Sequence, residues 1–264
     1  MSPTNTISSD LKYKSAGEGM PLVLLHGFCE NKDIWDGFIG PLSAKYRVIA
    51  VDLPGFGSNP PLEHPLTIAD MAEALYGFLQ SIGVEQCAMI GHSLGGYVAL
   101  AFGEKFQQRL RGLGLFHSTA YADSLEKKQG RSKSLEFVEK YGVAEFAEEF
   151  LTPLFFEGRR KDLHDQIRTV VEAGKHTPQS TVVEVIKAMR DRKDRTKVLE
   201  KASYPVLFIA GKNDTAINFT TSVNQFWLPA NGTVHYLSNT GHMGMIEREA
   251  ETLKMVFHFL AEIE

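Results

Sequence analysis

Short apolar runs alternate with longer amphipathic stretches along most of the chain. The runs are typical of buried strands, and apolar positions three and four residues apart are typical of helices. The predicted strands cover residues 21–26, 46–51, 85–90, 110–116, 205–210 and 233–237. The predicted helices cover residues 34–45, 67–83, 97–106 and 246–263, with one more between the last two strands. Thr67, with Asp70 three residues later, is the predicted N-cap of the second helix. This alternation predicts an α/β fold with a mostly parallel central sheet and helices on both of its faces.

Residues 119–200 interrupt the alternation. This segment shows helical spacing, for example Val182, Val183, Ile186 and Met189, and no strand pattern. We therefore expect a helical insertion, called the cap below. The predicted division is a core formed by residues 1–118 and 201–264, and a cap formed by residues 119–200.

Composition excludes several classes of protein. The 264 residues are 43% hydrophobic and 23% charged, which is typical of a globular chain with a sizeable core. The formal net charge of −4 argues against a nucleic-acid partner, and no run approaches the ~20 apolar residues of a membrane span. Residues 1–10 are polar and predict no signal peptide, and the two cysteines, Cys29 and Cys87, form no CxxC pair. We expect a cytoplasmic protein with a small-molecule partner, and neither a nucleic acid nor a membrane.

The clearest chemical motif is Gly91-His92-Ser93-Leu94-Gly95, which matches G-x-S-x-G. A predicted strand precedes it and a predicted helix follows it, which is the context that a nucleophile elbow requires. The chain must reverse sharply there, so larger side chains at the two glycine positions would clash. The motif therefore predicts Ser93 as a nucleophile held at a helix N-terminus.

With this motif, the chain resembles the α/β-hydrolase superfamily over nearly its whole length. The matching pieces occur in the order that the family uses: LLHGF at 24–28, DLPGFGSN at 52–59, GHSLGG at 91–96, AGKND at 210–214 and GHMGMIE at 241–247. The resemblance implies the α/β-hydrolase fold, with a serine-nucleophile branch similar to esterases and lactonases.

A serine hydroxyl needs a base, and that base needs a partner to fix its tautomer. Among nine histidines, His242 follows the last predicted strand, where the family's catalytic histidine lies. Asp214 ends the segment after the preceding strand, so Ser93, Asp214 and His242 follow the Ser…Asp…His order of this fold. Asp123 is the alternative acid, because some relatives place it after the earlier strand. His26 is assigned a structural role in the HGF turn.

Two backbone amides are candidates for the oxyanion hole. Leu94 follows the nucleophile, and Phe28 is the matching donor by resemblance to the HGF pattern. The cap is rich in aromatic residues and should lie over the carboxyl ends of the strands. An apolar acyl pocket follows as a hypothesis, although any single aromatic residue also fits a packing role.

The predicted reaction is hydrolysis of a carboxylic ester, thioester or lactone through an acyl-enzyme on Ser93, with no organic cofactor and no metal. Carbon–carbon bond hydrolases and aminopeptidases of the same fold are alternatives. For an aminopeptidase, Glu145, Glu148 and Glu149 are candidate amine anchors. A hydrolase-like ligand receptor is an alternative of a different class. The oligomeric state is left open.

Overall fold

A seven-stranded sheet forms the centre of the computed structural model, which describes residues 10–263 apart from the side chain of Thr221. The prediction that no signal peptide is present concerns residues that lie largely outside this range. The strands are β1 (Tyr13–Ala16), β2 (Pro21–Leu25), β3 (Arg47–Val51), β4 (Cys87–His92), β5 (Leu110–Phe116), β6 (Val206–Gly211) and β7 (Gly232–Leu237). Their order is β1-β3-β2-β4-β5-β6-β7.

The predicted mostly parallel α/β sheet is confirmed. Only the pairing of β1 with β3 is antiparallel among the described strands. β1 was not predicted, because its sequence YKSA contains no apolar run and its residues are only partly buried. β2, β4 and β5 lie in the middle of the sheet, and their buried apolar residues gave the strongest strand patterns.

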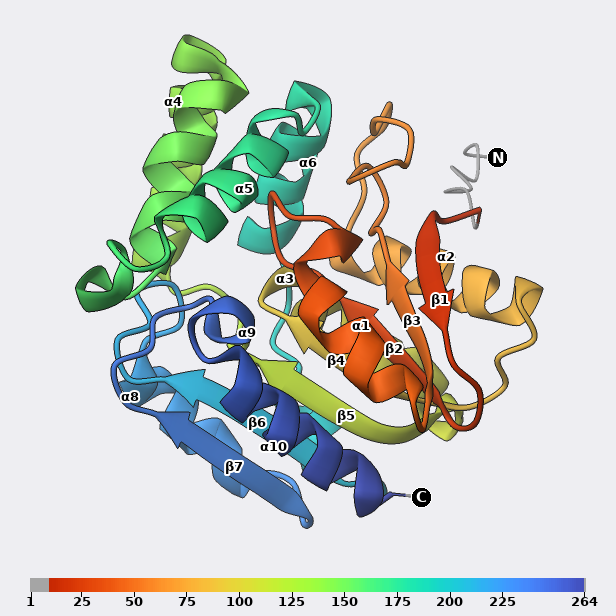
Figure 1. The fold of residues 1–264 in the computed structure, drawn as a ribbon. Helices are drawn as coiled ribbons and strands as arrows, with labels where there is room; N and C mark the ends of the chain where they lie inside the picture. Colours follow the sequence, from red (N-terminus) through yellow and green to blue (C-terminus); the bar gives the residue numbers. More distant parts are fainter. Residues whose placement is uncertain (1–9, 264) are drawn as a thin grey trace, which may run out of the picture.

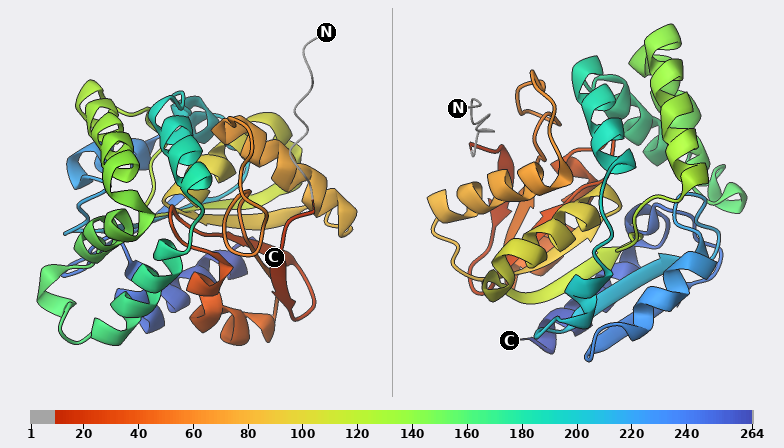
Figure 2. Two further views of the ribbon diagram at one scale, coloured as in Figure 1. Left: turned by 90° about the horizontal axis from the view of Figure 1, so that it is seen from above. Right: turned by 180° about the vertical axis from the view of Figure 1, so that it is seen from behind.

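Helices cover both faces of the sheet. The helices α1 (Asp36–Ser43) and α10 (Glu249–Ala261) contact each other on one face, and α2 (Ile68–Ser81) and α3 (Leu94–Phe106) contact each other on the opposite face (Figures 1 and 2). Two predicted helices are divided in the structure. A 3-10 turn, η1 (Lys32–Trp35), precedes α1, and α9 (Gly244–Glu247) is separated from α10 at Arg248, which has φ −140°.

The segment between β5 and β6 is helical, as its spacing indicates. It contains α4 (Leu125–Leu151), α5 (His164–Lys175), α6 (Gln179–Arg190) and α7 (Thr196–Glu200), with the 3-10 turns η3 (Thr152–Leu154) and η4 (Glu157–Arg159). A glycine with φ 84°, Gly142, kinks α4. The helices α4, α5 and α6 stand together at the end of the sheet toward which β5 and β6 point (Figure 1). Between β6 and β7 lie α8 (Phe219–Val223) and η5 (Asn224–Trp227), and η2 (Gln107–Arg109) precedes β5.

Aromatic packing fixes α1 to the sheet. Trp35 is fully buried, and its ring makes edge contacts with Phe38 and Phe116 at centroid distances of 5.3 and 5.6 Å. Cys29 and Cys87 are buried free thiols. Among the described residues, no helix is both long and apolar enough to cross a membrane.

The start of α2 carries the N-terminal cap that the sequence predicts. The Thr67 hydroxyl accepts from the Asp70 amide at 3.2 Å, and the Asp70 carboxylate accepts from the Thr67 amide at 2.7 Å. Thr67 is therefore the N-cap of α2 and forms a complete capping box with Asp70. We expect Thr67→Ala to lower the free energy of unfolding by about 1 kcal/mol, measured by urea denaturation. Thr67→Ser keeps the hydroxyl and should match the wild type; equal losses in both variants would contradict the capping role.

Candidate active site

The turn between β4 and α3 holds Ser93 in a strained backbone conformation. Its φ of 49° and ψ of −111° are rare for a residue with a side chain, and such strain concentrates at functional sites. A Cβ on Gly91 would lie 2.2 Å from the carbonyl carbon of Gly95, and one on Gly95 would lie 2.5 Å from the Leu25 carbonyl oxygen. Both glycines of the motif are therefore required by close backbone approach.

Asp214 and His242 come together from the ends of β6 and β7. The His242 Nδ1 lies 2.8 Å from Asp214 Oδ2, and both side chains are only 2% exposed. The other oxygen, Oδ1, accepts from the amides of Ala216 and Ile217, both at 2.8 Å. Burial opposes ionisation of Asp214, but His242 and the second histidine described next hold its pKa well below the ordinary value. The carboxylate is therefore charged and can orient His242.

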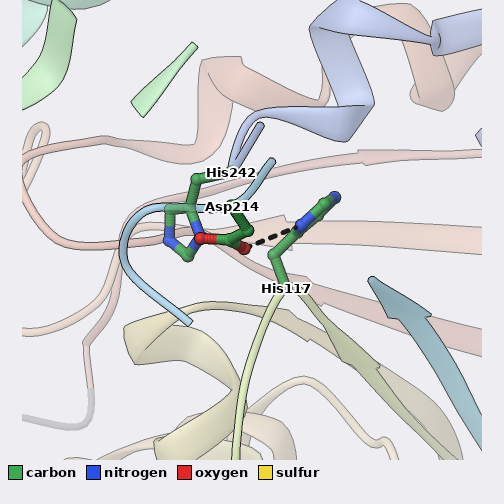
Figure 3. A group of neighbouring side chains, drawn as sticks. All are labelled: His117, Asp214 and His242. Carbon is green, nitrogen blue, oxygen red and sulfur yellow. Dashed lines mark hydrogen bonds and ion pairs between the residues drawn. The ribbon is translucent and has the colours of Figure 1, made fainter. Parts of the chain in front are cut away.

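A second imidazole, which the sequence reading did not single out, contacts the same carboxylate. His117 follows β5, and its Nδ1 lies 3.1 Å from Asp214 Oδ2 (Figure 3). Its backbone has φ 47°, and its buried Nε2 has no hydrogen-bond partner within the part of the chain that the structure describes. The ligand atoms of the three residues lie within 4.8 Å of one another. Hydrogen bonds to Asp214 account for this cluster, and we assign no metal to it.

The loop that carries His242 is bound to the cap. The His242 amide donates to the Leu154 carbonyl at 2.7 Å. Glu247, which is 2% exposed, accepts from the amides of Gly241 and Met243 on either side of His242, at 2.9 and 3.1 Å, and from the Phe156 amide at 3.0 Å. One buried carboxylate therefore joins the histidine loop to the segment between η3 and η4. Glu247 lies within the family-like GHMGMIE segment, but nothing in its spacing indicated this role.

The candidate base, His242, has surroundings that favour its neutral form. Burial lowers the pKa of His242 below its ordinary value, although the Asp214 charge partly opposes that shift. Within residues 10–263 the Ser93 hydroxyl makes no hydrogen bond to His242. In free enzymes such contacts often tighten only when the substrate binds.

Two other histidines, His26 of the HGF turn and His92 of the G-x-S-x-G motif, lie beside this site. His26 is fully buried, accepts from the Leu53 amide through Nε2 at 2.9 Å, and contacts the Gly27 carbonyl through Nδ1, which fits a structural role. His92 is also fully buried. Its Nδ1 lies 3.0 Å from Glu30 Oε2, and its Nε2 lies 2.9 Å from the His242 carbonyl oxygen. Glu30 is a further site neighbour that the sequence reading did not single out.

Asp123, the alternative acid, is engaged elsewhere. Its two oxygens form ion pairs with Arg192 at 2.7 Å and with Arg131 at 3.2 Å, and its side chain is fully buried. Among the described residues, it makes no hydrogen bond to His242. The carboxylate that contacts His242 is therefore that of Asp214, and Asp123 ties the first cap helix to the end of α6.

Phe28, the predicted oxyanion donor, connects the core to the cap through its side chain. Its ring makes edge contacts with Phe146 and Phe150 of α4 at centroid distances of 6.2 and 5.6 Å, and those two rings stack on each other at 5.3 Å. Leu94 is the first residue of α3, where backbone amides have no partner within the helix. The aromatic residues of the cap thus gather beside one of the two residues expected to form the oxyanion hole.

The candidate amine anchors on α4 lie on its outer side. Glu145, Glu148 and Glu149 are exposed, and Glu148 forms an ion pair with Lys175 at 2.9 Å. Solvent and a lysine satisfy these carboxylates, which fits a solvated helix face better than a buried anchor for a substrate amine.

Comparison with known proteins gives the family. Residues 20–249 match the model of the alpha/beta hydrolase fold, and the chain belongs to this family. It is similar to a 2-hydroxy-6-oxononadienedioate/2-hydroxy-6-oxononatrienedioate hydrolase of Pseudomonas sp., with 24% identity over 97% of this chain and 93% of the relative. A 34% identical match to the dihydrolipoyllysine-residue acetyltransferase component of an acetoin cleaving system from Cupriavidus necator covers 44% of this chain and only 31% of that protein.

The fold is also that of solved structures. A thermophilic esterase from Thermogutta terrifontis superimposes with a TM-score of 0.91 at 28% identity, over 96% of this chain and 93% of the esterase. The predicted fold class is therefore confirmed, and the chain is a hydrolase of the α/β fold.

Two aspartate variants test the assignment of the acid. Asp214→Asn replaces an acceptor with an amide that favours the wrong tautomer of His242, so we expect hydrolytic activity to fall by several orders of magnitude, about 10⁴-fold in comparable triads. The measurement is kcat/KM on a chromogenic substrate, with circular dichroism to show that the fold is retained.

The matched variant is Asp123→Asn. Breaking a buried ion pair costs about 3–5 kcal/mol, so this change should lower thermal stability while the folded fraction keeps its activity. If Asp123→Asn abolished activity and Asp214→Asn did not, the acid would have to be reassigned.

Proposed function

We propose that this protein is a serine hydrolase that cleaves carboxylic esters, including thioesters and lactones, through an acyl-enzyme on Ser93. The observation that carries the proposal is the arrangement of a strained serine on a strand-to-helix turn with a buried Asp214–His242 pair at 2.8 Å. The 28% identical esterase, which matches over nearly the full length of both chains, supports the ester class.

The first step is attack of Ser93 Oγ on the substrate carbonyl carbon. His242 accepts the hydroxyl proton at Nε2, since its Nδ1 is bonded to Asp214. Asp214 stays ionised and stabilises the imidazolium that forms. His242 then returns the proton to the leaving oxygen or sulfur, and the carbonyl bond reforms as the acyl-enzyme.

The second half of the cycle uses the same groups. A water molecule gives a proton to His242 Nε2 and attacks the acyl carbon, and the acid product leaves as the proton returns to Ser93. In both halves negative charge develops on the former carbonyl oxygen. The amides of Phe28 and Leu94 are the proposed donors to that oxygen, each contributing about 3–4 kcal/mol to transition-state stabilisation in comparable enzymes.

The aromatic cluster of Phe28, Phe146 and Phe150 suggests the character of the acyl group. These rings come from the oxyanion turn and from the cap, so an acyl chain held between core and cap would contact apolar side chains. We therefore propose an apolar acyl substrate. A cytoplasmic location and a small-molecule partner remain predictions from the sequence.

A second candidate is hydrolysis of a carbon–carbon bond. The 2-hydroxy-6-oxononadienedioate/2-hydroxy-6-oxononatrienedioate hydrolase that matches 97% of this chain favours it, at 24% identity. A screen with esters of rising chain length, thioesters, lactones, β-diketones and aminoacyl substrates separates these reactions. We expect multiple turnover on esters; turnover confined to β-diketones would move the function to carbon–carbon cleavage, and single-turnover labelling alone would favour a receptor.

Covalent labelling tests the nucleophile itself. A fluorophosphonate probe should modify the wild type at Ser93, identified by mass spectrometry of the labelled peptide. Ser93→Ala should abolish labelling and ester hydrolysis while leaving the melting temperature close to that of the wild type. Ser118→Ala is the neighbouring control, because Ser118 Oγ donates to the Ser93 carbonyl at 2.8 Å; labelling that persisted in Ser93→Ala would rule out the assignment.

A further inference from the structure

Two buried ionisable residues beside Ser93, Asp214 and His242 take no part in the proposed mechanism. Glu30 is 5% exposed and His92 is 0% exposed. Glu30 Oε2 accepts from the Gly27 amide at 2.7 Å and lies 3.0 Å from His92 Nδ1. On its other side, His92 Nε2 lies 2.9 Å from the carbonyl oxygen of His242. The pair therefore runs from the oxyanion turn, through the residue before Ser93, to the backbone of the catalytic histidine.

The partners of His92 determine how many protons the pair holds. A carbonyl oxygen only accepts, so His92 Nε2 must carry a hydrogen. His92 Nδ1 faces a carboxylate oxygen, and without a proton between them two lone pairs would lie 3.0 Å apart. One more proton is therefore held between Glu30 and His92. Burial opposes charge on both groups, but each raises the stability of the other's charged form: the pKa of His92 is raised and that of Glu30 is lowered.

We propose that Glu30 and His92 form a positioning pair for the catalytic histidine: Glu30 keeps His92 as an imidazolium, which fixes the His242 peptide and places a positive charge beside the His242 ring. This inference rests on the proposed role of His242 as the base. His92 and Glu30 act through His242 and do not contact the reacting atoms in this mechanism.

The positioning effect arises because both backbone groups of His242, its N–H and its C=O, are hydrogen-bonded. The His242 amide is held by the Leu154 carbonyl at 2.7 Å, and its carbonyl is held by His92 at 2.9 Å. Together with the Asp214 contact at Nδ1, these bonds restrain both the backbone and the ring of His242. A base held in this way loses little entropy when it meets the serine proton.

The electrostatic effect on the His242 ring depends on whether His92 or Glu30 lies nearer to it. The ring centroids of His92 and His242 are 4.8 Å apart, and the His92 ring lies between His242 and Glu30. The positive member is closer, so the pair disfavours a second imidazolium at His242 and lowers the pKa of that ring. Other titratable groups that interact with the pair are His26, Cys29, His117 and Asp214.

The protonation state of His242 sets the expected pH dependence of activity. His242 acts as a base only when neutral, so kcat/KM falls as pH drops through its pKa. A lower pKa moves this acid limb to lower pH and keeps the base free over a wider range. The acid limb should therefore lie below about pH 6.5, the ordinary value for histidine.

Glu30→Gln removes the charge with almost no change in shape. A glutamine cannot balance an imidazolium, so His92 becomes neutral and the positive charge beside His242 is lost. We expect the pKa of His242 to rise by about one pH unit. The primary measurement is NMR titration of the His242 imidazole in the full chain without substrate, assigned with a His242→Gln variant.

Two further variants keep the test decisive. Asp33→Asn removes an exposed carboxylate three residues away and should leave the pKa of His242 unchanged. If Glu30→Gln does not fold, the double variant Glu30→Gln/His92→Gln removes the pair without leaving a buried charge unpaired, and it should show the same rise. A pKa that moves no more than in Asp33→Asn, or that falls, overturns the proposal.

The activity profile separates this inference from the proposed function. If the protein hydrolyses esters, the acid limb of kcat/KM should move upward with the NMR value in Glu30→Gln. If it hydrolyses none, the serine hydrolase proposal fails while the titration still decides whether the pair tunes His242. If the NMR pKa of His242 rises in Glu30→Gln but the acid limb of kcat/KM stays in place, His242 is not the base.

Discussion

The close backbone approach at the end of β4 is the constraint on which the site depends. Because Gly91 and Gly95 carry no side chain, the first turn of α3 can lie against the ends of β4 and β2. This contact forces the strained conformation of Ser93. It also brings three neighbours of the turn together: Phe116 accepts the Ser93 amide, Ser118 donates to the Ser93 carbonyl, and His92 reaches the His242 loop. The serine is thus held by its surroundings and not by its own side chain.

The second organising feature is the attachment of the His242 loop to both the core and the cap. Glu247 accepts amides on both sides of His242 and the amide of Phe156 in the cap. A movement of the segment from η3 to η4 would therefore disturb His242 directly, through the Leu154 carbonyl and through Glu247. The cap therefore supplies part of the framework that orients His242.

The sequence predicted the features that are local in the chain. Buried strands in the middle of the sheet have continuous apolar runs. The Thr67 N-cap and the glycines around Ser93 are each indicated by a few neighbouring residues. Asp214 and His242 were predicted because each follows a late strand of a parallel sheet, where a family-like order places an acid and a base. The Asp214–His242 contact in the structure agrees with that pairing.

The residues that were missed are those whose partners lie far along the chain. Glu30 and His92 are 62 residues apart, and His117 and Asp214 are 97 residues apart, so no spacing in the sequence connects them. His117 did carry one signal, since a polar residue directly after a buried strand of a parallel sheet lies at the edge where ligands bind. The edge strand β1 was missed for a different reason, because partial exposure removes the apolar run that identifies a strand.

The charged groups around His242 are compensated by hydrogen bonds, and together they set the protonation state of its ring. Three buried carboxylates, Glu30, Asp214 and Glu247, each accept several N–H groups, so none is left without compensation. Asp214 alone contacts the His242 ring, and it favours the protonated base; burial and the neighbouring His92 oppose that preference. An imidazole paired only with Asp214 would have a higher pKa, so more of it would already be protonated at a given pH and unable to accept the serine proton. In the proposed mechanism, His242 thus has one carboxylate that stabilises its imidazolium during the reaction and surroundings that favour its neutral form beforehand.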